Sequence, residues 1–155
     1  MSLDSIKIFT EDFFNRHWNE SILKRERPSW TTPWLFKGTL PNHDKQGCYV
    51  LLSRRGVIYV GVGASIVGGI YKGHGLGSRT KRYYRLVPGG RSLPCNERLY
   101  TPTELWERRG LNGISTIGFD IGFGYLASSL ESYILSKFIL PFNKSMPGDG
   151  NSTGT

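Results

Sequence analysis

Glu131 is an acidic residue whose spacing from apolar neighbours makes it a candidate for chemistry. On a helix it would share a face with Ile134, Leu135 and Phe138, which lie three, four and seven residues further along. An unpaired carboxylate at the edge of a core is costly, so we expect a partner, either an arginine, a hydrogen-bond network or a metal ion. A salt bridge to Arg79 or to another basic residue explains the position equally well.

Tyr49 and Tyr59 lie ten residues apart on two short apolar runs, residues 48–52 and 57–60. The runs are separated by four residues that end in a glycine. Branched and aromatic residues on both sides of such a break are typical of a β-hairpin. We therefore predict a hairpin over residues 47–63, with one tyrosine on each strand.

The basic residues are concentrated in one part of the chain. The formal net charge is +8, and no acidic residue occurs between Asp44 and Glu97. The same interval contains nine basic residues, which are Lys45, Arg54, Arg55, Lys72, Arg79, Lys81, Arg82, Arg85 and Arg91. A long stretch of one sign indicates a polyanionic partner, of which nucleic acid fits best. An anionic membrane fits less well because no basic amphipathic anchor helix is evident. A contribution to solubility is the alternative.

A short basic helix is predicted after the hairpin. Ser78 is a suitable N-cap for a helix over residues 79–85, on which Arg79, Arg82 and Tyr83 share a face. We expect so basic a helix to lie at the surface. The glycine-rich connection before it lacks the Gly-Lys-Ser/Thr ending of a phosphate-binding P-loop, so nucleotide binding of that kind is not supported.

The remaining periodic segments predict helices near both ends of the chain and a third strand. Residues 4–26 show helical spacing, with Asp4 or Ser5 as the cap, and their apolar side is expected to cover one face of the sheet. Alternation predicts a strand over residues 114–121. An apolar stripe predicts the last helix over residues 126–140.

The irregular segments are rich in residues that end helices and strands. Residues 27–46 contain prolines and tryptophans, and we expect these tryptophans to pack against the core rather than to stack on bases. Residues 87–112 form a long connection with a small helix over residues 104–109, whose role the sequence does not reveal. The tail 145–155 is rich in Gly, Ser and Thr and is predicted to be disordered.

Length and composition indicate a soluble globular protein with one core. The chain has 155 residues, of which 38% are hydrophobic and 21% are charged. No apolar run approaches the roughly 18 residues of a membrane span, and the N-terminus lacks the apolar stretch of a secretory signal. The two cysteines, Cys48 and Cys95, form neither a disulfide framework nor a metal-ligand spacing, so a reduced, cytoplasmic compartment is expected.

The residues around the hairpin tyrosines resemble the signature of the GIY-YIG nuclease family. The two triplets read Gly-Cys-Tyr49 and Tyr59-Val-Gly, each one residue away from the form that names the family. Arg79 matches the arginine that members have on the following helix. Many members have a histidine one turn later, where this chain has Tyr83 instead.

The later part of the family pattern is also present. Glu131 matches a glutamate of a later helix, and Asn143 matches an asparagine that follows a proline-containing stop. The resemblance covers residues 46–144, with insertions at 62–77 and 87–112.

The resemblance implies an α/β domain of the α+β type, in which helices flank a small three-stranded antiparallel sheet. Residues 1–45 would pack on this domain as an N-terminal helical arm and a Pro/Trp-rich segment.

The activity implied by the resemblance is metal-dependent hydrolysis of DNA phosphodiester bonds. One Mg²⁺ or Mn²⁺ ion would be held through Glu131, and Arg79 would stabilise negative charge on the phosphoryl oxygens. Tyr49 is expected to be the base, its pKa lowered by nearby cations, while Tyr59 orients the water; the reverse assignment stays open. Asn143 is expected to hold the architecture near the site rather than to react.

Six further residues are expected to contact DNA, and they are Lys72, His74, Lys81, Arg82, Tyr83 and Arg85. Cleavage of both strands by so small a domain would require a homodimer or two binding events.

Two alternatives to the nuclease stay open. The departure at Tyr83 and the long spacing from Tyr59 to Arg79 are compatible with a catalytically weak or inactive nucleic-acid-binding module of the same fold. The chain is also compatible with a small basic structural or partner-binding domain. Geometry distinguishes these interpretations, because a nuclease requires the two tyrosines, Arg79 and Glu131 to converge on one concave face.

Overall fold

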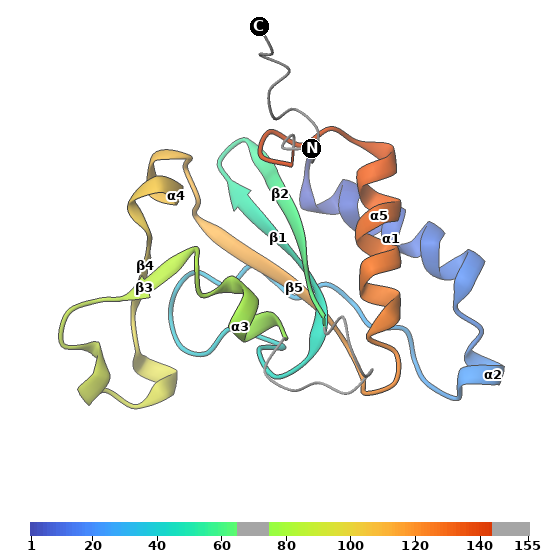
Figure 1. The fold of residues 1–155 in the computed structure, drawn as a ribbon, viewed down its shortest axis with the longest axis horizontal. Helices are drawn as coiled ribbons and strands as arrows, with labels where there is room; N and C mark the ends of the chain where they lie inside the picture. The colour runs from blue at the N-terminus through green and yellow to red at the C-terminus, as the bar shows by residue number, and fades with distance from the viewer. Residues whose placement is uncertain (65–74, 144–155) are drawn as a thin grey trace, which may run out of the picture.

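A three-stranded antiparallel sheet forms the centre of the computed structural model, which describes residues 1–64 and 75–143 (Figure 1). Its strands are β1 (Gln46–Ser53), β2 (Gly56–Gly63) and β5 (Gly113–Phe119), in the order β2-β1-β5. The hairpin and the third strand predicted from the sequence are both present. The α+β class with a small antiparallel sheet flanked by helices is therefore confirmed.

The register of the hairpin sets the direction of its tyrosines. Tyr49 on β1 lies opposite Gly61 on β2, and Leu51 lies opposite Tyr59. The register then shifts by one residue, which leaves Ile58 as the extra residue of a β-bulge. Side chains normally alternate between the faces of a strand. Because of the bulge, Ile58 and Tyr59 both contact the same apolar cluster although they are neighbours.

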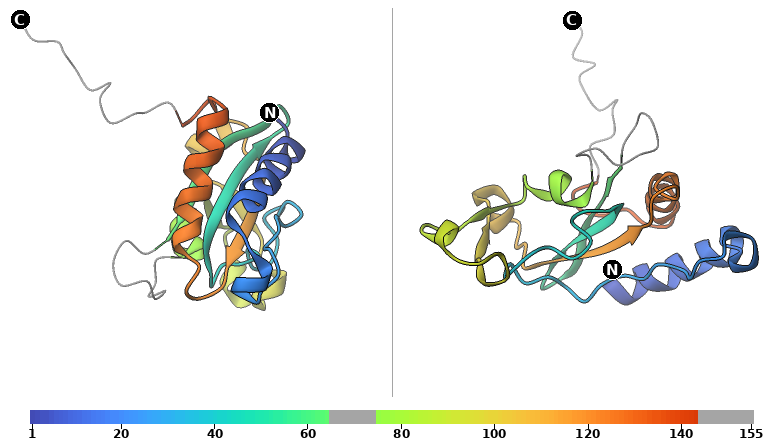
Figure 2. Two further views of the ribbon diagram at one scale, coloured as in Figure 1. Left: turned by 90° about the vertical axis from the view of Figure 1, so that its right-hand side faces the viewer. Right: turned by 90° about the horizontal axis from the view of Figure 1, so that it is seen from below.

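Two helices pack against each other and cover one face of the sheet (Figure 2). They are α1 (Leu3–His17) and α5 (Tyr125–Lys137), which correspond to the first and last predicted helices. Ile6 and Phe14 of α1 and Leu130 of α5 are fully buried in a first cluster together with apolar residues of all three strands. The N-terminal arm therefore covers the sheet as expected.

The single helix predicted over residues 4–26 is wrong in two respects. Its cap is Ser2, whose hydroxyl accepts a hydrogen bond from the Ser5 amide, rather than Asp4 or Ser5. The helix also stops at Trp18, whose indole N–H donates to the Arg25 carbonyl, and a separate short helix, α2 (Glu20–Leu23), follows. Burial of the indole, with 7% exposed, explains the break that periodicity did not reveal.

The predicted helix over residues 79–85 is also wrong. Helix α3 (Leu76–Thr80) begins before Ser78, and the chain then enters strand β3 (Tyr84–Leu86), which pairs with β4 (Tyr100–Pro102). Pairing with a distant strand overrides a weak local helix propensity. The basic residues Arg79, Lys81, Arg82 and Arg85 do lie at the surface, as expected, whereas Thr80 and Tyr83 are buried.

The segment 87–112 forms part of the face opposite α1 and α5. Its predicted small helix is α4 (Glu104–Arg108), and two single-turn 3₁₀ helices precede it, η1 (Gly90–Ser92) and η2 (Cys95–Glu97). The β3–β4 ribbon extends away from the sheet on this side (Figure 2). Trp106 of α4 is buried in a second cluster, which also contains Tyr49, Leu51 and Tyr83.

The tryptophans of the irregular segment 27–46 pack against the core, as predicted. Trp30 and Trp34 are 8% and 6% exposed, and their indole N–H groups donate to Thr10 and to the Lys37 carbonyl. The segment runs beside β5, where Trp34 and Ile114 exchange backbone hydrogen bonds. Base stacking by these two rings is therefore not available without unpacking the core.

Within residues 1–64 and 75–143, no helix has both the length and the apolar character of a membrane span. The glycine-rich insertion lies largely outside the described residues, as does the predicted disordered tail.

Candidate active site

Tyr49 lies at the centre of the second cluster and is fully buried. Its ring crosses Gly61 on the neighbouring strand, and a Cβ atom at position 61 would lie 2.4 Å from the Tyr49 Oη. Real Cβ atoms do not approach so closely. The last position of the Tyr59-Val-Gly triplet therefore requires glycine, because a larger residue would clash with the Tyr49 ring. The tyrosine of the first motif triplet therefore packs directly on the glycine of the second.

Three tyrosine rings meet on this face, and we call Tyr49, Tyr59 and Tyr83 the tyrosine cluster. Ring centroids are 6.1 Å apart for Tyr49–Tyr59, 5.6 Å for Tyr49–Tyr83 and 6.1 Å for Tyr59–Tyr83. The hydroxyl oxygens of Tyr49 and Tyr83 are 2.7 Å apart. Tyr83, which stands where the resemblance predicts a histidine, thus bonds directly to a motif tyrosine.

The pKa expected for Tyr49 is wrong in direction. Burial raises the pKa of Tyr49 well above its ordinary value, and the positive charge of Arg79 offsets only part of this effect. Burial also raises the pKa of Tyr83 to about 12. Tyr49 is therefore a neutral phenol in this structure, whereas Tyr59 is only half-buried and can meet solvent.

One hydrogen bond joins two of the three hydroxyl groups. It lies between Tyr49 and Tyr83, and either hydroxyl can be its donor. Tyr59, the half-buried member of the cluster, meets the other two tyrosines through ring contacts.

Glu131 is half-buried on α5, close to the thiol of Cys48 on β1. Burial raises the pKa of Glu131, and the charge of Arg79 acts in the opposite direction. Among the described residues no basic group lies within 4.0 Å of its carboxylate oxygens. The expected arginine partner is thus present as a nearby charge and not as a contact ion pair.

Arg79 is the residue that connects the two sides of the site. It is exposed on α3, and its charge lowers the pKa values of both Tyr49 and Glu131. α3 packs on one face of β2 while α5 contacts β2 from the other, so Arg79 is in range of groups on both faces at this edge of the sheet. The tyrosine cluster and Glu131 therefore lie on opposite faces at one edge of the sheet, so the four residues do not share the single concave face that was expected of a nuclease.

Asn143 binds the backbone of the edge strand β2. Its side-chain amide donates to the Val60 carbonyl at 2.8 Å, and its Oδ1 accepts from the Val60 amide at 2.9 Å. An edge strand otherwise presents such groups unpaired. The architectural role expected of Asn143 agrees with these two bonds.

The residues expected to contact DNA fall into three groups. Lys81, Arg82 and Arg85 are exposed and carry no salt bridge within the described residues. Tyr83 is 2% exposed and bonded to Tyr49, so it is not available for the contact expected of it. The two others, Lys72 and His74, lie outside the described residues.

Sequence reasoning missed Trp106, which packs on the site from the long connection. Its ring centroid lies 4.9 Å from Tyr83 and 6.1 Å from Tyr59. The one available signal was an aromatic residue two positions before a pair of arginines on a short predicted helix. That pattern does not specify what the ring contacts.

A divalent cation fits Glu131 on chemical grounds. The described residues contain no group of three or more His, Cys, Asp or Glu side chains that could enclose a metal ion. Mg²⁺ needs only one or two carboxylates because it keeps several of its waters. A half-buried carboxylate with no cation in contact is therefore a sufficient ligand.

No protein-family model, curated protein or solved structure matches this chain.

Proposed function

We propose that this protein is a metal-dependent endonuclease that hydrolyses DNA phosphodiester bonds. The observation that carries the proposal is the tyrosine cluster, in which both motif tyrosines meet on the face of the hairpin that is covered by α3, the helix that bears the exposed Arg79. A phosphodiester is protected from attack by its own negative charge, so a site for its hydrolysis needs cations around the phosphate and a group that orients water. These residues offer both.

Each residue has a role that its surroundings support. Arg79 is exposed and its fork of N–H donors suits two phosphoryl oxygens. Glu131 would hold a divalent cation, which supplies further positive charge at the phosphate when bound. Asn143 keeps β2 in place beside the site.

Tyr59 keeps the role first expected of it, whereas Tyr49 does not suit the role of base. Tyr59 is half-buried, so its hydroxyl oxygen accepts a hydrogen bond from the attacking water and orients it. Tyr49 is buried and bonded to Tyr83, so it holds Tyr83 in place against the Tyr59 ring. The water oxygen then bonds to phosphorus as the bond from phosphorus to one ester oxygen breaks, and the proton that the water loses ends on the departing ester oxygen.

A nucleic-acid-binding module without efficient cleavage is the second candidate. The raised pKa of Tyr49 and its bond to Tyr83 favour it, because neither suits a residue that removes a proton from water. This candidate would bind nucleic acid through the same basic surface as the nuclease, and it differs only in that it does not cleave the phosphodiester bond efficiently.

Cleavage of supercoiled plasmid DNA with Mg²⁺ or Mn²⁺ tests the proposal. We expect the wild type to nick the plasmid, and we expect Glu131→Ala or a chelator to abolish nicking. Arg79→Gln should slow cleavage by about 100-fold, typical for loss of one charge-stabilising donor. Glu26→Ala removes an exposed carboxylate that is far from Glu131 in the sequence, and it should leave the cleavage rate unchanged. DNA binding without cleavage under either metal would instead establish the binding module.

A further inference from the structure

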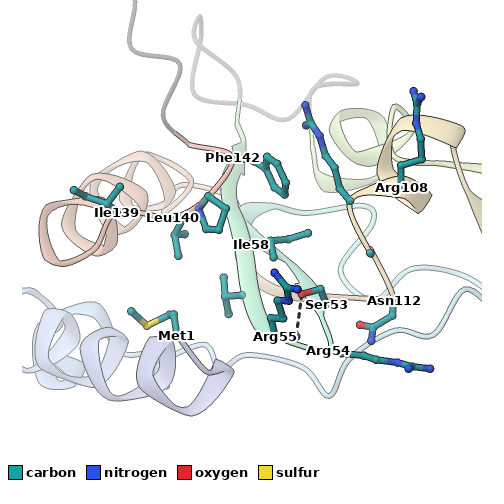
Figure 3. Close-up of a pocket in the computed structure, with 14 residues that line it drawn as sticks. Met1, Ser53, Arg54, Arg55, Ile58, Arg108, Asn112, Ile139, Leu140 and Phe142 are labelled. Carbon is teal, nitrogen blue, oxygen red and sulfur yellow. Dashed lines mark hydrogen bonds between the residues drawn. The ribbon is translucent and has the colours of Figure 1, made fainter.

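A pocket of about 790 Å³ opens beside the hairpin turn, where β1 meets β2 (Figure 3). Its walls come from that turn, from the end of α4 and from the segment after α5. We call it the arginine groove after the four arginines among its lining residues, which are Arg54, Arg55, Arg108 and Arg109.

The groove is positively charged and its charge is not neutralised within the described residues. No acidic residue lines it, and none of its four arginines has a carboxylate within 4.0 Å. Arg54, Arg55 and Arg108 are exposed. Like charges lining a recess concentrate the field there and attract anions.

Arg109 is held in place by two aromatic rings. Its guanidinium carbon lies 4.6 Å from the ring centroid of Trp106 and 4.3 Å from that of Phe142. Stacking on both rings orients the planar group and leaves the N–H donors on its edge free to bind an anion. The groove therefore has one ordered arginine as well as three exposed ones.

The groove and the tyrosine cluster lie along the same edge strand. The Phe142 amide donates to the Ile58 carbonyl on β2 at 3.1 Å. The Phe142 ring packs on Trp106 at 5.7 Å, and Trp106 packs on Tyr59 at 6.1 Å. A ligand that passes Tyr59 along β2 would thus reach the groove.

We infer that the arginine groove binds the phosphodiester backbone of DNA next to the bond that is cleaved. This inference rests on the proposed function and deepens it, because it gives the segment 87–112 a role in holding the substrate. Arginines on separate walls suit a chain of repeated phosphates. A recess with a single strongly exposed apolar residue, Ile139 at 83%, suits a flat bilayer less well.

Salt dependence of DNA binding tests the inference with the triple variant Arg54→Gln/Arg55→Gln/Arg108→Gln. The dissociation constant for a short fluorescein-labelled DNA duplex is measured by anisotropy over a range of salt concentrations, with chelator present to prevent cleavage. Each lost phosphate contact lowers the slope of log affinity against log salt by about 0.9. We expect the triple variant to lose about 2.7 of the wild-type slope, the sum for three contacts.

A matched control removes three positive charges that already have partners. Arg16, Arg25 and Arg27 form salt bridges with acidic residues, so Arg16→Gln/Arg25→Gln/Arg27→Gln changes the net charge equally. We expect its slope to stay within about 1 of the wild type, since long-range charge alone contributes little. Circular dichroism checks the fold of both variants. If the groove variant does not fold, Arg108→Gln alone should still lower the slope by about 0.9.

The outcomes separate the inference from the proposed function. Equal slopes for the groove variant and the control would overturn the groove while leaving the nuclease, provided that the wild type cleaves. A reduced slope without any cleavage would support the groove and overturn the nuclease. No DNA binding at low salt would overturn both. Loss of binding to phosphatidylserine vesicles with an unchanged DNA slope would identify the groove as a membrane contact instead.

Discussion

Arginines on the α1 side of the sheet have acidic partners within the chain, whereas those on the α3 and α4 side do not. Arg16, Arg25 and Arg27 each bind an acidic residue. Within the described residues, no basic residue from Arg54 to Arg109 forms a salt bridge. The positive charge of this second group is therefore not offset by ion pairs among the described residues.

The two clusters differ in the same way. The first cluster is built mainly from aliphatic and phenylalanine side chains, whereas the second contains the tyrosine cluster. Apolar packing stabilises a fold without chemistry of its own. Buried hydroxyls add little net stability but fix geometry when each is bonded. One side is thus held mainly by apolar packing, and the other also contains bonded tyrosine hydroxyls.

Substitution of Leu130 by Ala should produce the largest change, and it tests the apolar side. Leu130 is fully buried in the first cluster, so its truncation removes apolar contact and leaves a cavity. We expect the free energy of unfolding to fall by about 3 kcal/mol, measured by urea denaturation. Leu105→Ala, at a position that is 46% exposed, is the matched control and should change stability by less than about 0.5 kcal/mol. Similar losses at both positions would contradict the comparison.

Substitution of Tyr83 by Phe should have an intermediate effect and tests the polar side. It removes the hydroxyl that lies 2.7 Å from the Tyr49 hydroxyl and leaves the latter buried without that partner. We expect a loss of about 1–2 kcal/mol in the free energy of unfolding. Tyr125→Phe, at a position that is 65% exposed, should be neutral. A neutral result for Tyr83→Phe would mean that the hydrogen bond between the two hydroxyls is not needed to hold Tyr49.

The smallest predicted effect is the contribution of Glu131 to the pH dependence of the free energy of unfolding. Burial raises its pKa in the folded state above the ordinary 4.5. The folded protein therefore binds more protons than the unfolded chain just above pH 4.5, and its stability falls as pH rises through that window. Glu131→Gln should remove this fall, seen by comparing denaturation midpoints of the two proteins across the window. A parallel pH profile for both proteins would show that Glu131 is not desolvated on folding.

Local sequence patterns predicted the hairpin and the last helix because their causes are local. Apolar runs around a glycine-containing break and a stripe at helical spacing are visible without tertiary contacts. The helix predicted over 79–85 failed because its last residues pair with Tyr100–Pro102, which lie far along the chain. Such pairing leaves no trace in a local window.

The candidate site shows the same division between local and tertiary information. Side-chain types and order selected Tyr49, Arg79 and Glu131, and the charge of Arg79 reaches the other two. The direction of the Tyr49 pKa could not be predicted, since it depends on burial by Tyr83 and its neighbours. The bulge at Ile58 was equally hidden, although it directs Tyr59 toward the cluster.

The bonds of Asn143 with Val60 also bear on how the molecule opens. They join residues that are 83 positions apart in the chain, and they hold the Val60 amide without help from a neighbouring strand. Local opening requires far less free energy than global unfolding. We therefore expect the Val60 amide to exchange its hydrogen with solvent when the short turn at Asn143 is released. Amides that are hydrogen-bonded between β1 and β5 should exchange only when the whole sheet unfolds.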